Sequence, residues 1–365
     1  MRNSIFCSTA PIGRGHGGGI VSYYELMALN ETTTLVKVLC PKVNNLDIVN
    51  ISNVQLINLN GHYEDNPFMY DYLTSLKVKH DIDIDVAFFN GAPFSSTVRA
   101  INPGKVIVDV PAHNLERSIE EWEKWNGEYP FKHMVDPFLW QLYTDFIINA
   151  DVIICPSKMS AEYVKRNPGT RAEVVVIPHG CDLPEVKPLP SDFKVGYLGA
   201  TGPDKGLIYL LKAWAGLMYK DSELLLKASL ADMSNMSMMS LFQKGQKVNV
   251  LGWVENTSDD FFNKISVYIQ PSVTEGFGIP CLEAMAHGRP VIVSEGAGVS
   301  ELVTNGQEGY VVPIRSPGSI ADRIDYLKTH PNKVTEMGRK ARLKAEKYTW
   351  ERSKNEIKKE LLKLS

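Results

Sequence analysis

The stretch VYIQPSVTEGFGIPCLEAMAHG, residues 267–288, contains a strand, a glycine-rich loop and a helix in one run. The apolar residues 267–270 are typical of a strand buried on both faces. Gly276 and Gly278 permit a tight loop with exposed amides, and Pro280 is well placed to begin a helix that ends near Gly288. This order of elements is the unit of a parallel α/β sheet.

The same alternation extends through the rest of the chain. Short Val/Ile-rich runs predict strands, and the longer stretches between them predict helices. The expected strands are 5–7, 34–39, 54–57, 86–89, 105–108, 152–155, 174–177, 194–198, 224–227, 248–251, 267–270, 291–293 and 309–312. Helices are expected at 20–29, 159–166, 207–217 and 280–288. We therefore expect an α/β fold with doubly wound parallel sheets.

The length and one proline cluster predict two domains. The chain has 365 residues, which fits about two domains of ~150 residues. The densest proline cluster, residues 178–190, predicts a linker between the two domains. We expect an N-terminal domain at 1–183, a C-terminal domain at 184–345 and a final helix at 346–365. The amphipathic pattern from Trp350 onward predicts packing of that helix on a domain, with peripheral membrane contact as the alternative.

Charge and cysteine content exclude several classes of protein. The net charge of −3 gives no electrostatic footprint for duplex nucleic acid. The five cysteines are scattered and form no CxxC pair, which favours reduced thiols over disulfides or a zinc site. No apolar run approaches the ~18 residues of a spanning helix. The N-terminal segment 4–7 is too short to be the apolar region of a secretory signal peptide. We therefore expect a cytoplasmic protein, with peripheral attachment at the inner membrane face as the further alternative.

A glycine-rich loop follows the first predicted strand. Residues 13–18, GRGHGG, match the G-x-G-x-x-G pattern. A dinucleotide site would also need an acid at the end of the second strand, but that strand ends in Leu39-Cys40-Pro41. Closely approaching amides and a helix N-terminus still predict contact with a phosphate or a sugar. A merely flexible turn is the alternative.

Two acids flank the loop of the opening stretch. Glu275 stands at the loop mouth, and Glu283 lies about one turn into the helix. Loop amides and a helix N-terminus bind anions or sugar hydroxyls, and carboxylates accept hydrogen bonds from paired hydroxyls. The alternative interpretation is a helix whose early acids offset its dipole, which explains Glu283 but not the glycine loop.

Lys205 lies between the strand 194–198 and the helix 207–217. A lysine at the carboxyl end of a strand, beside Gly206 and a helix start, is placed to bind a diphosphate. An exposed first-turn lysine is the alternative. The D-x-D pattern at residues 81–85 could hold a metal against a diphosphate, but it leads into an apolar strand and is interpreted as a charged strand entry.

Together these residues resemble the retaining glycosyltransferases of family 4, which have the GT-B fold. That fold consists of two Rossmann-like domains with doubly wound parallel sheets, facing a central cleft. The resemblance implies that the domain at 1–183 binds the acceptor and that the domain at 184–345 binds the nucleotide-sugar donor. It also implies that the helix at 346–365 crosses back to the N-terminal domain. The second half carries the more specific motifs, in particular two glutamates eight positions apart within a G-F-G-x-P frame. The matching stretches are 196–206, 250–254, 271–286, 288–292, 301–303 and 308–313, and more loosely 18–19, 108–113, 150–157, 176–180 and 348–350.

The resemblance implies a role for each matched residue. The catalytic residues would be His113, Lys205 and Glu275. Lys205 would bind the donor diphosphate, Glu283 the ribose hydroxyls, and Glu275 the donor sugar. The further donor-binding residues would be Gly18, Gly19, Trp253, Val254, Gly276, Phe277, Gly278 and Ile279, with Trp253 and Val254 at the base and His113 near the anomeric carbon.

The chain departs from the family at one position. The family usually has an arginine directly after the glycine that matches Gly199, and here that residue is Ala200. A charged hydrogen bond to an anion contributes roughly 1.5–3 kcal/mol, which corresponds to ~10–100-fold in rate. Our hypothesis is that Arg14, in the glycine-rich loop, supplies a diphosphate contact in its place. A weakened or non-catalytic member is the other interpretation.

The resemblance implies sugar transfer from a nucleotide-diphosphate sugar to a hydroxyl acceptor. Fixed positive groups would stabilise the leaving diphosphate, so no metal and no cofactor is expected besides the nucleotide-sugar co-substrate. Without an obvious enzymic nucleophile, retention suggests attack on the same face, assisted by the leaving phosphate. The alternatives are Glu275 as a covalent nucleophile, a weakly active or non-catalytic subunit, and a sugar-nucleotide epimerase of the same fold.

Overall fold

The protein divides into two compact units. The first comprises residues 1–112, 136–179 and 350–365, and the second comprises residues 113–135 and 180–349. The structure is a computed structural model, and it describes residues 3–8, 12, 17–40, 51, 53–58, 74–75, 77–78, 83–90, 94–110, 115–125, 146–217, 219–228, 247–251 and 258–364.

The first unit contains a seven-stranded sheet in the order β3-β2-β1-β4-β5-β6-β7, and every neighbouring pair is parallel. Its strands are rich in Val, Ile and Phe, and β4 and β6 are buried throughout. Such strands need cover on both faces. Their bounds are β1 Asn3–Ser8, β2 Leu35–Cys40, β3 Val54–Asn58, β4 Val86–Asn90, β5 Lys105–Asp109, β6 Val152–Cys155 and β7 Glu173–Val176.

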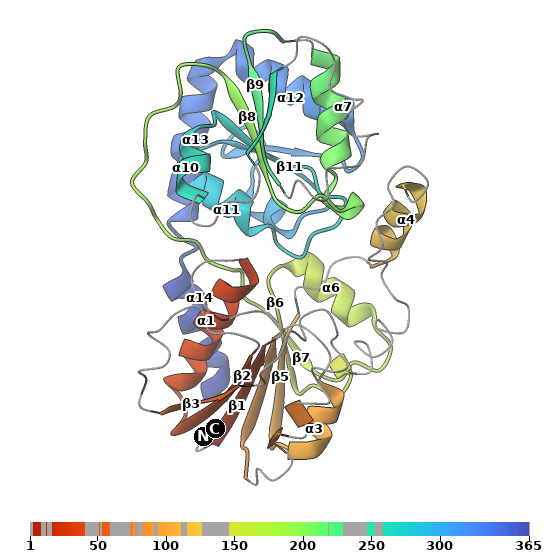
Figure 1. The fold of residues 1–365 in the computed structure, drawn as a ribbon, viewed down its shortest axis with the longest axis vertical. Helices are drawn as coiled ribbons and strands as arrows, with labels where there is room; N and C mark the ends of the chain where they lie inside the picture. Colours follow the sequence, from red (N-terminus) through yellow and green to blue (C-terminus); the bar gives the residue numbers. More distant parts are fainter. Residues whose placement is uncertain are drawn as a thin grey trace. The chain divides into compact units, whose positions relative to one another are not determined.

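Helices cover both faces of this sheet (Figure 1). On one face α1 (Gly17–Asn30) and α14 (Trp350–Leu362) share an apolar core with β1, β2 and β4. On the other face α3 (Ser95–Ile101) and α6 (Lys158–Arg166) pack on a second core. Ser157 caps α6, because its hydroxyl accepts the amide of Ser160 at 3.0 Å.

The second unit contains a six-stranded parallel sheet in the order β10-β9-β8-β11-β12-β13. This order repeats that of β3-β2-β1-β4-β5-β6 in the first unit. In both sheets the winding direction reverses once, between β1 and β4 and between β8 and β11, and such a point is where α/β proteins bind ligands. The bounds are β8 Lys194–Leu198, β9 Glu223–Lys227, β10 Lys247–Val250, β11 Val267–Gln270, β12 Val291–Ser294 and β13 Gly309–Val312.

The second sheet also has an apolar core on each of its two faces. Residues of α7 and α12 fill one core, and residues of α10 and α11 fill the other. The helix α13 contributes its first half to the former core and its second half to the latter. The bounds are η2 Pro203–Lys205, α7 Leu207–Leu217, α10 Ser258–Asn263, α11 Ile279–Ala286, η3 Gly298–Leu302, α12 Pro317–Thr329 and α13 Pro331–Ala345, with α4 at Leu115–Trp125.

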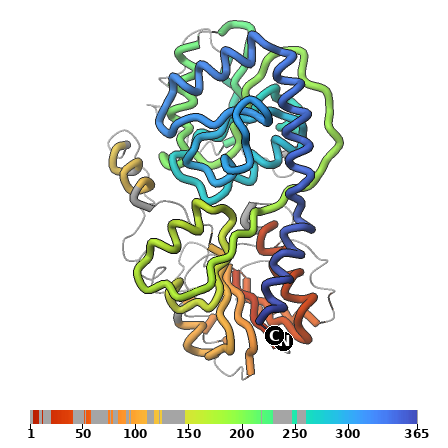
Figure 2. The backbone as a smooth tube through the Cα atoms, turned by 180° about the vertical axis from the view of Figure 1, so that it is seen from behind, coloured from red at the N-terminus to blue at the C-terminus, as the bar shows by residue number. Residues whose placement is uncertain are grey.

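The last helix packs on the first unit, through its apolar side. Figure 2 shows its blue C-terminal end beside the red N-terminal segment. Ile357 and Leu361 are buried in the core that contains α1, and the rings of Trp350 and Tyr24 stack with centroids 5.2 Å apart. Glu31 accepts hydrogen bonds from two lysines of α14. The apolar side of α14 is therefore occupied by protein.

The expected α/β fold with two doubly wound parallel sheets is confirmed, and each expected strand is present within a residue or two of its expected bounds. Two details differ. The helix α1 begins at Gly17 rather than Ile20, so Gly18 and Gly19 lie in its first turn instead of a loop. Residues 113–135 group with the second unit, whereas we expected them in the N-terminal domain. Contacts of α4 with η2 explain that grouping.

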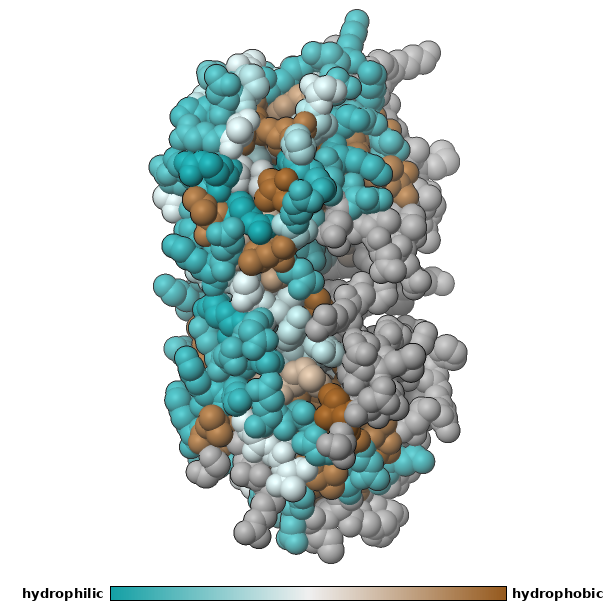
Figure 3. Space-filling view, turned by 90° about the vertical axis from the view of Figure 1, so that its left-hand side faces the viewer, coloured by the Kyte–Doolittle hydropathy of each residue, from teal (hydrophilic) through white to brown (hydrophobic). Residues whose placement is uncertain are grey.

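No helix within the described ranges is long and apolar enough to cross a membrane. On the face shown in Figure 3, apolar side chains are scattered among polar ones. All five cysteines are buried and none is part of a disulfide, as expected for small apolar side chains.

Gly206 is a position where both the backbone conformation and a close approach require a glycine. Its φ is +68°, and an added Cβ would overlap the carbonyl oxygen of Pro271. We expect Gly206→Ala to lower the free energy of unfolding by about 1–3 kcal/mol, because both the left-handed conformation and the contact are then strained. Urea unfolding of the variant measures this loss.

Gly216→Ala is the matched control. Gly216 lies in α7 with open space around its Cα, so alanine there should raise stability by up to ~1 kcal/mol. Equal effects of the two substitutions would contradict the account of Gly206.

Candidate active site

The turn after β8 positions Lys205. The chain leaves Leu198, passes Ala200 and forms the short helix η2, which ends at Gly206 in the left-handed conformation. The Tyr197 hydroxyl donates a hydrogen bond to the carbonyl oxygen of Ala200 and fixes the start of this turn. Lys205 therefore stands at the carboxyl end of the sheet, beside the β8–β11 switch point.

The loop after β11 is tied to the same turn. The amide of Val273 donates to the carbonyl oxygen of Asp204 at 2.8 Å. The amide of Glu275 donates to the carbonyl oxygen of Gly296 at 2.9 Å, and the amide of Gly298 donates to the carbonyl oxygen of Glu275 at 3.0 Å. Backbone bonds on both sides of Glu275 thus fix its main chain at the mouth of the loop.

Lys205 and Glu275 form an ion pair at the mouth of the loop. Lys205 Nζ lies 2.7 Å from Glu275 Oε2 and 3.4 Å from Asp204 Oδ2. The two paired side chains are 23% and 24% exposed. Burial disfavours the charge on Lys205, but the neighbouring charges of Glu275 and Asp204 outweigh it, so the pKa of Lys205 is raised. Lys205 stays a cation and is matched by two carboxylates.

The helix α11 begins directly after the glycine loop. Gly278 has φ +104° and precedes Ile279, the first residue of the helix. An amide in a helix's first turn has no acceptor within the helix and can bind an anion or a hydroxyl. Glu283 lies in the same helix and is partly exposed. The side chain of Phe277, by contrast, is 3% exposed and packs in the core, so only its backbone can line the site.

Lys227 is a charged residue at this edge that was not among the expected site residues. It is the last residue of β9 and only 6% of its surface is exposed. Burial lowers its pKa, and the charges of Glu283 and Asp260 act in the opposite direction without cancelling the shift. The signal in the sequence was a lysine that ends the apolar run Leu224–Leu226.

The first unit has its own buried charges at the carboxyl edge of its sheet. Asn90 Nδ2, at the end of β4, donates to Glu25 Oε2 at 2.7 Å and to Asp109 Oδ2 at 3.2 Å. Burial raises the pKa of Asp109 to about 6. Burial and the Asp109 charge raise the pKa of Glu25 well above its ordinary value. These two carboxyl groups therefore hold a proton near neutral pH that the unfolded chain would release.

The helix α4 is joined to the second unit by polar contacts around a buried acid. Glu121 is fully buried and accepts a hydrogen bond from the Tyr209 hydroxyl at 2.7 Å. It also pairs with Arg315, which lies 2.9 Å from Glu120. Because α4 contacts η2, it rests on the turn that carries Lys205. We did not expect this contact from the sequence.

Four of the expected site residues, namely Arg14, His113, Trp253 and Val254, lie outside the described residues. The structure brings together Lys205, Glu275 and the backbone of 276–279 and places Glu283 in the helix that follows. Gly18 and Gly19 are in the first turn of α1, where their amides have no acceptor within the helix. Within the described ranges, no group of three or more His, Cys, Asp or Glu side chains is arranged to hold a metal ion.

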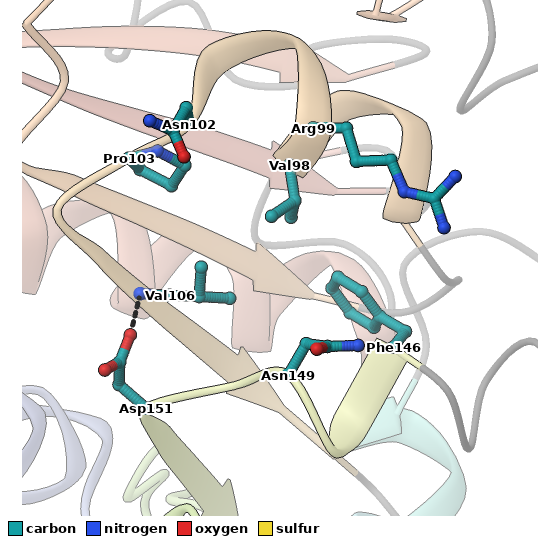
Figure 4. A pocket seen from close by; sticks show the side chains of 8 residues that line it. All are labelled: Val98, Arg99, Asn102, Pro103, Val106, Phe146, Asn149 and Asp151. Carbon is teal, nitrogen blue, oxygen red and sulfur yellow. Dashed lines mark hydrogen bonds between the residues drawn. The ribbon is translucent and has the colours of Figure 1, made fainter.

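A cavity of about 390 Å³ lies elsewhere in the first unit (Figure 4). It lies between the C-terminal end of α3 and the residues that precede β5 and β6, including Asn102 and Asp151. The Asp151 carboxylate accepts the amide of Val106 at 2.8 Å. The cavity thus lies at the amino ends of the strands, the opposite edge from the glycines of α1.

Two family models match this chain. The model "Glycosyltransferase Family 4" matches residues 17–185, and the model "Glycosyl transferases group 1" matches residues 183–344. Together they span both units and include the site around Lys205. The chain belongs to this family of glycosyltransferases, and its two Rossmann-like units are those of the GT-B fold.

Sequence relatives agree with this assignment. The chain is 27% identical over 232 residues to a D-inositol 3-phosphate glycosyltransferase of Streptomyces bingchenggensis, covering 56% of this chain and 51% of that protein. It is 27% identical over 216 residues to an uncharacterized glycosyltransferase of Methanocaldococcus jannaschii, covering 56% and 57%. The chain thus spans about half the length of the curated relatives it matches.

Solved structures share the fold. A sucrose-phosphate synthase from Thermosynechococcus elongatus superimposes with a TM-score of 0.80 at 19% identity, covering 100% of this chain and 98% of that one. The Anabaena protein HepE, in complex with UDP and glucose, has a TM-score of 0.75 at 15% identity, with 99% coverage of both chains. At such identities the likeness concerns the fold alone.

The carboxyl pair of the first unit predicts an unusual pH dependence of stability. Folding raises the pKa values of both carboxyl groups. The contribution of the pair to the free energy of unfolding is therefore fully present below the pKa values of the unfolded chain, near pH 4. It is lost as the pH rises through about 6 and above. We expect Glu25→Gln, which removes one charge, to unfold at a higher temperature than wild type at pH 8 and to flatten the profile between pH 5 and 8. Thermal unfolding by circular dichroism measures both.

Glu31→Gln is the control of opposite sign. Hydrogen bonds from Lys354 and Lys358 lower the pKa of Glu31, so its loss should not stabilise the protein at pH 8. Parallel profiles for wild type and Glu25→Gln would contradict the assignment of a shared proton to Glu25 and Asp109.

Proposed function

We propose that this protein transfers a sugar from a nucleotide-diphosphate sugar to a hydroxyl acceptor with retention of configuration and without a metal ion. The observation that carries the proposal is the arrangement of Lys205, Glu275 and the start of α11 at the carboxyl edge of the second sheet. Membership of the glycosyltransferase family supports the reaction class. A protein of the same fold, HepE of Anabaena, has been solved in complex with UDP and glucose and with UDP-glucose.

The donor would lie along that edge. Lys205 would contact the diphosphate, and Glu283 would accept hydrogen bonds from the ribose hydroxyls. Glu275 and the amides of 276–279 would hold the donor sugar, and Trp253 and Val254 would contact the base. These roles follow the family resemblance at the matched positions. They are supported by the neighbouring strands β8 and β11, which bring Lys205 and Glu275 to one edge of the sheet.

The first unit would bind the acceptor. The first-turn amides of Gly18 and Gly19 would contact the diphosphate, since they carry the positive end of the α1 dipole. His113 would face the sugar near its anomeric carbon. Arg14 would add positive charge in place of the basic side chain that is missing at Ala200.

The chemical step requires charge stabilisation rather than an enzymic nucleophile. The bond between the anomeric carbon and the diphosphate oxygen breaks as the acceptor oxygen attacks from the same face. The acceptor proton passes to an oxygen of the leaving phosphate, which conserves charge and protons. Lys205 and the helix N-termini stabilise the departing diphosphate, and Glu275 holds the sugar through its hydroxyls. We also propose a cytoplasmic location, in keeping with five buried thiols.

A ligand screen followed by a donor-release assay tests the proposal. Thermal unfolding with UDP-, GDP- and ADP-sugars should show a shift for one base, since a ligand at 100 times its Kd adds ~2.7 kcal/mol. The shifting donor should then be hydrolysed slowly in the absence of acceptor. Tight binding with no release would instead indicate a non-catalytic subunit, and no shift with any donor would contradict the proposal.

Lys205→Ala and Glu275→Gln should each reduce donor turnover by ~10–100-fold, because each removes a charged contact made in the transition state. The melting temperature should change far less than the rate. Lys212→Ala, at an exposed position of α7, and Glu301→Gln, at an exposed position of η3, are the controls and should keep wild-type turnover. A Lys205 or Glu275 variant with full activity would remove that residue from the site.

A further inference from the structure

The helix α4 packs away from the sheet to which its place in the chain assigns it. In sequence it lies between β5 and β6, two neighbouring strands of the first sheet. A helix that connects two parallel strands ordinarily covers the sheet of those strands. Residues 113–135 instead group with the second unit, and α4 contacts η2, the turn that carries Lys205.

Glu121 holds α4 in this place through two side chains of the second unit. Its carboxylate is fully buried, and Oε2 accepts a hydrogen bond from the Tyr209 hydroxyl at 2.7 Å. The other oxygen, Oε1, pairs with Arg315 Nε. Lys124 Nζ, one turn further along α4, lies 3.0 Å from the same Tyr209 hydroxyl. Because a buried carboxylate is costly when it loses a partner, these contacts hold α4 firmly.

Both partners of Glu121 lie just beyond the carboxyl ends of strands in the second sheet. Tyr209 is in the first turn of α7, and its amide donates to the carbonyl oxygen of Gly206 at 2.9 Å. Arg315 follows β13 and directly precedes Ser316, the N-cap of α12. The helix α4 therefore docks at the same edge of the second sheet that carries Lys205 and Glu275.

The backbone of Arg315 is strained at this contact. Its φ is +58°, in the left-handed region that is unfavourable for residues other than glycine. Such a conformation persists where the surrounding contacts impose it, and it is concentrated at functional sites. Arg315 Nη2 lies 2.9 Å from Glu120 Oε2, and Nε pairs with Glu121. Two acids of α4 thus hold the side chain of a strained residue.

A short segment connects this docked helix to the first sheet. The strand β5 ends at Asp109 and α4 begins at Leu115, so only residues 110–114 lie between them. At ~3.3–3.6 Å per residue such a segment spans at most ~20 Å. It includes His113, the residue expected near the anomeric carbon of the donor sugar. The docking of α4 therefore fixes one end of the segment that carries His113.

We propose that Glu121, with Tyr209 and Arg315, is a positioning residue for sugar transfer, because it holds α4 at the donor edge and so restrains the segment 110–114. The inference rests on the proposed function, since it concerns the rate of that reaction. Lys205 is held independently of α4, by Glu275 and by the backbone bond from Val273 to Asp204. Loss of the α4 contact should therefore lower turnover and leave diphosphate binding unchanged.

Kinetics and binding of two conservative variants test the inference. Tyr209→Phe removes only the hydroxyl that donates to Glu121, and Glu121→Gln removes the charge that pairs with Arg315. The probe is the UDP-, GDP- or ADP-sugar that most stabilises wild type, with water as the acceptor. We expect each variant to lower kcat for donor hydrolysis ~10-fold and to keep KM within ~2-fold of wild type, because misplacement of a reacting group slows the chemical step.

Isothermal titration with the matching nucleoside diphosphate separates positioning from donor binding. Both variants should keep the wild-type Kd, whereas Lys205→Ala should weaken the diphosphate and lower kcat together. Glu123→Gln, at an exposed position of the same helix, is the control and should match wild type in kcat, KM and Kd.

A double variant and a glycine substitution show whether the residues act through one contact. Tyr209→Phe combined with Glu121→Gln should lower kcat about as much as either change alone, whereas independent effects would multiply to ~100-fold. Arg315→Gly removes the guanidinium and relieves the left-handed backbone, since glycine adopts that conformation readily. It should show the same loss of kcat, and it keeps the test available if Glu121→Gln fails to fold.

Three results would overturn the inference. An unchanged kcat in Tyr209→Phe and Arg315→Gly is one. A lower melting temperature with wild-type kcat in the folded enzyme is another, because it indicates a structural role alone. The third is a rise in the diphosphate Kd that matches the fall in kcat, which would place the effect at Lys205. Failure of wild type to bind any of the three diphosphates would contradict the proposed function itself, which distinguishes that failure from failure at Glu121.

Discussion

The ion pair between Lys205 and Glu275 joins the two strand–loop–helix units that flank the switch point of the second sheet. Lys205 follows β8 and Glu275 follows β11, and these strands are neighbours although 70 residues separate the two side chains. Backbone bonds from the β11 loop to Asp204 and Gly296 hold both partners. The ion pair and these backbone bonds together place the loop and the start of α11 beside η2.

The same winding in both sheets explains why charged groups gather where they do. The carboxyl ends of parallel strands lie at one edge of the sheet, so residues at or just beyond those ends lie close together. In the second unit that edge holds Lys205, Glu275 and Lys227. In the first unit the corresponding edge holds Glu25, Asn90 and Asp109, which share hydrogen bonds in a buried site. Lys205 is paired with carboxylates, whereas Glu25 and Asp109 hold a proton near neutral pH. Both arrangements join residues that are distant in sequence, so each is sensitive to loss of one member.

Much of the fold could be predicted from local sequence. The strands are short apolar runs, and the start of α11 is marked by Gly278 and Pro280, so pattern and turn residues agree. Glu275 and Lys205 could be predicted as site residues because each follows a strand directly. The sequence predicts a later start for α1, because the three glycines 17–19 are typical of a loop although they form the first helical turn.

Other features depend on packing that no local pattern reveals. Glu121 looks like one of several surface acids in α4, yet it is buried against Tyr209 and Arg315. Lys227 looks like the polar end of a strand, yet it is buried, and burial lowers its pKa.

The central claim is that the carboxyl edge of the second sheet binds an activated sugar through its diphosphate. Hydrogen–deuterium exchange of the whole protein, with and without a saturating nucleoside diphosphate, tests it most directly. We expect slower exchange in peptides covering residues 199–206 and 275–287. Slower exchange confined to other segments, such as those lining the cavity near Asn102 and Asp151, would contradict it.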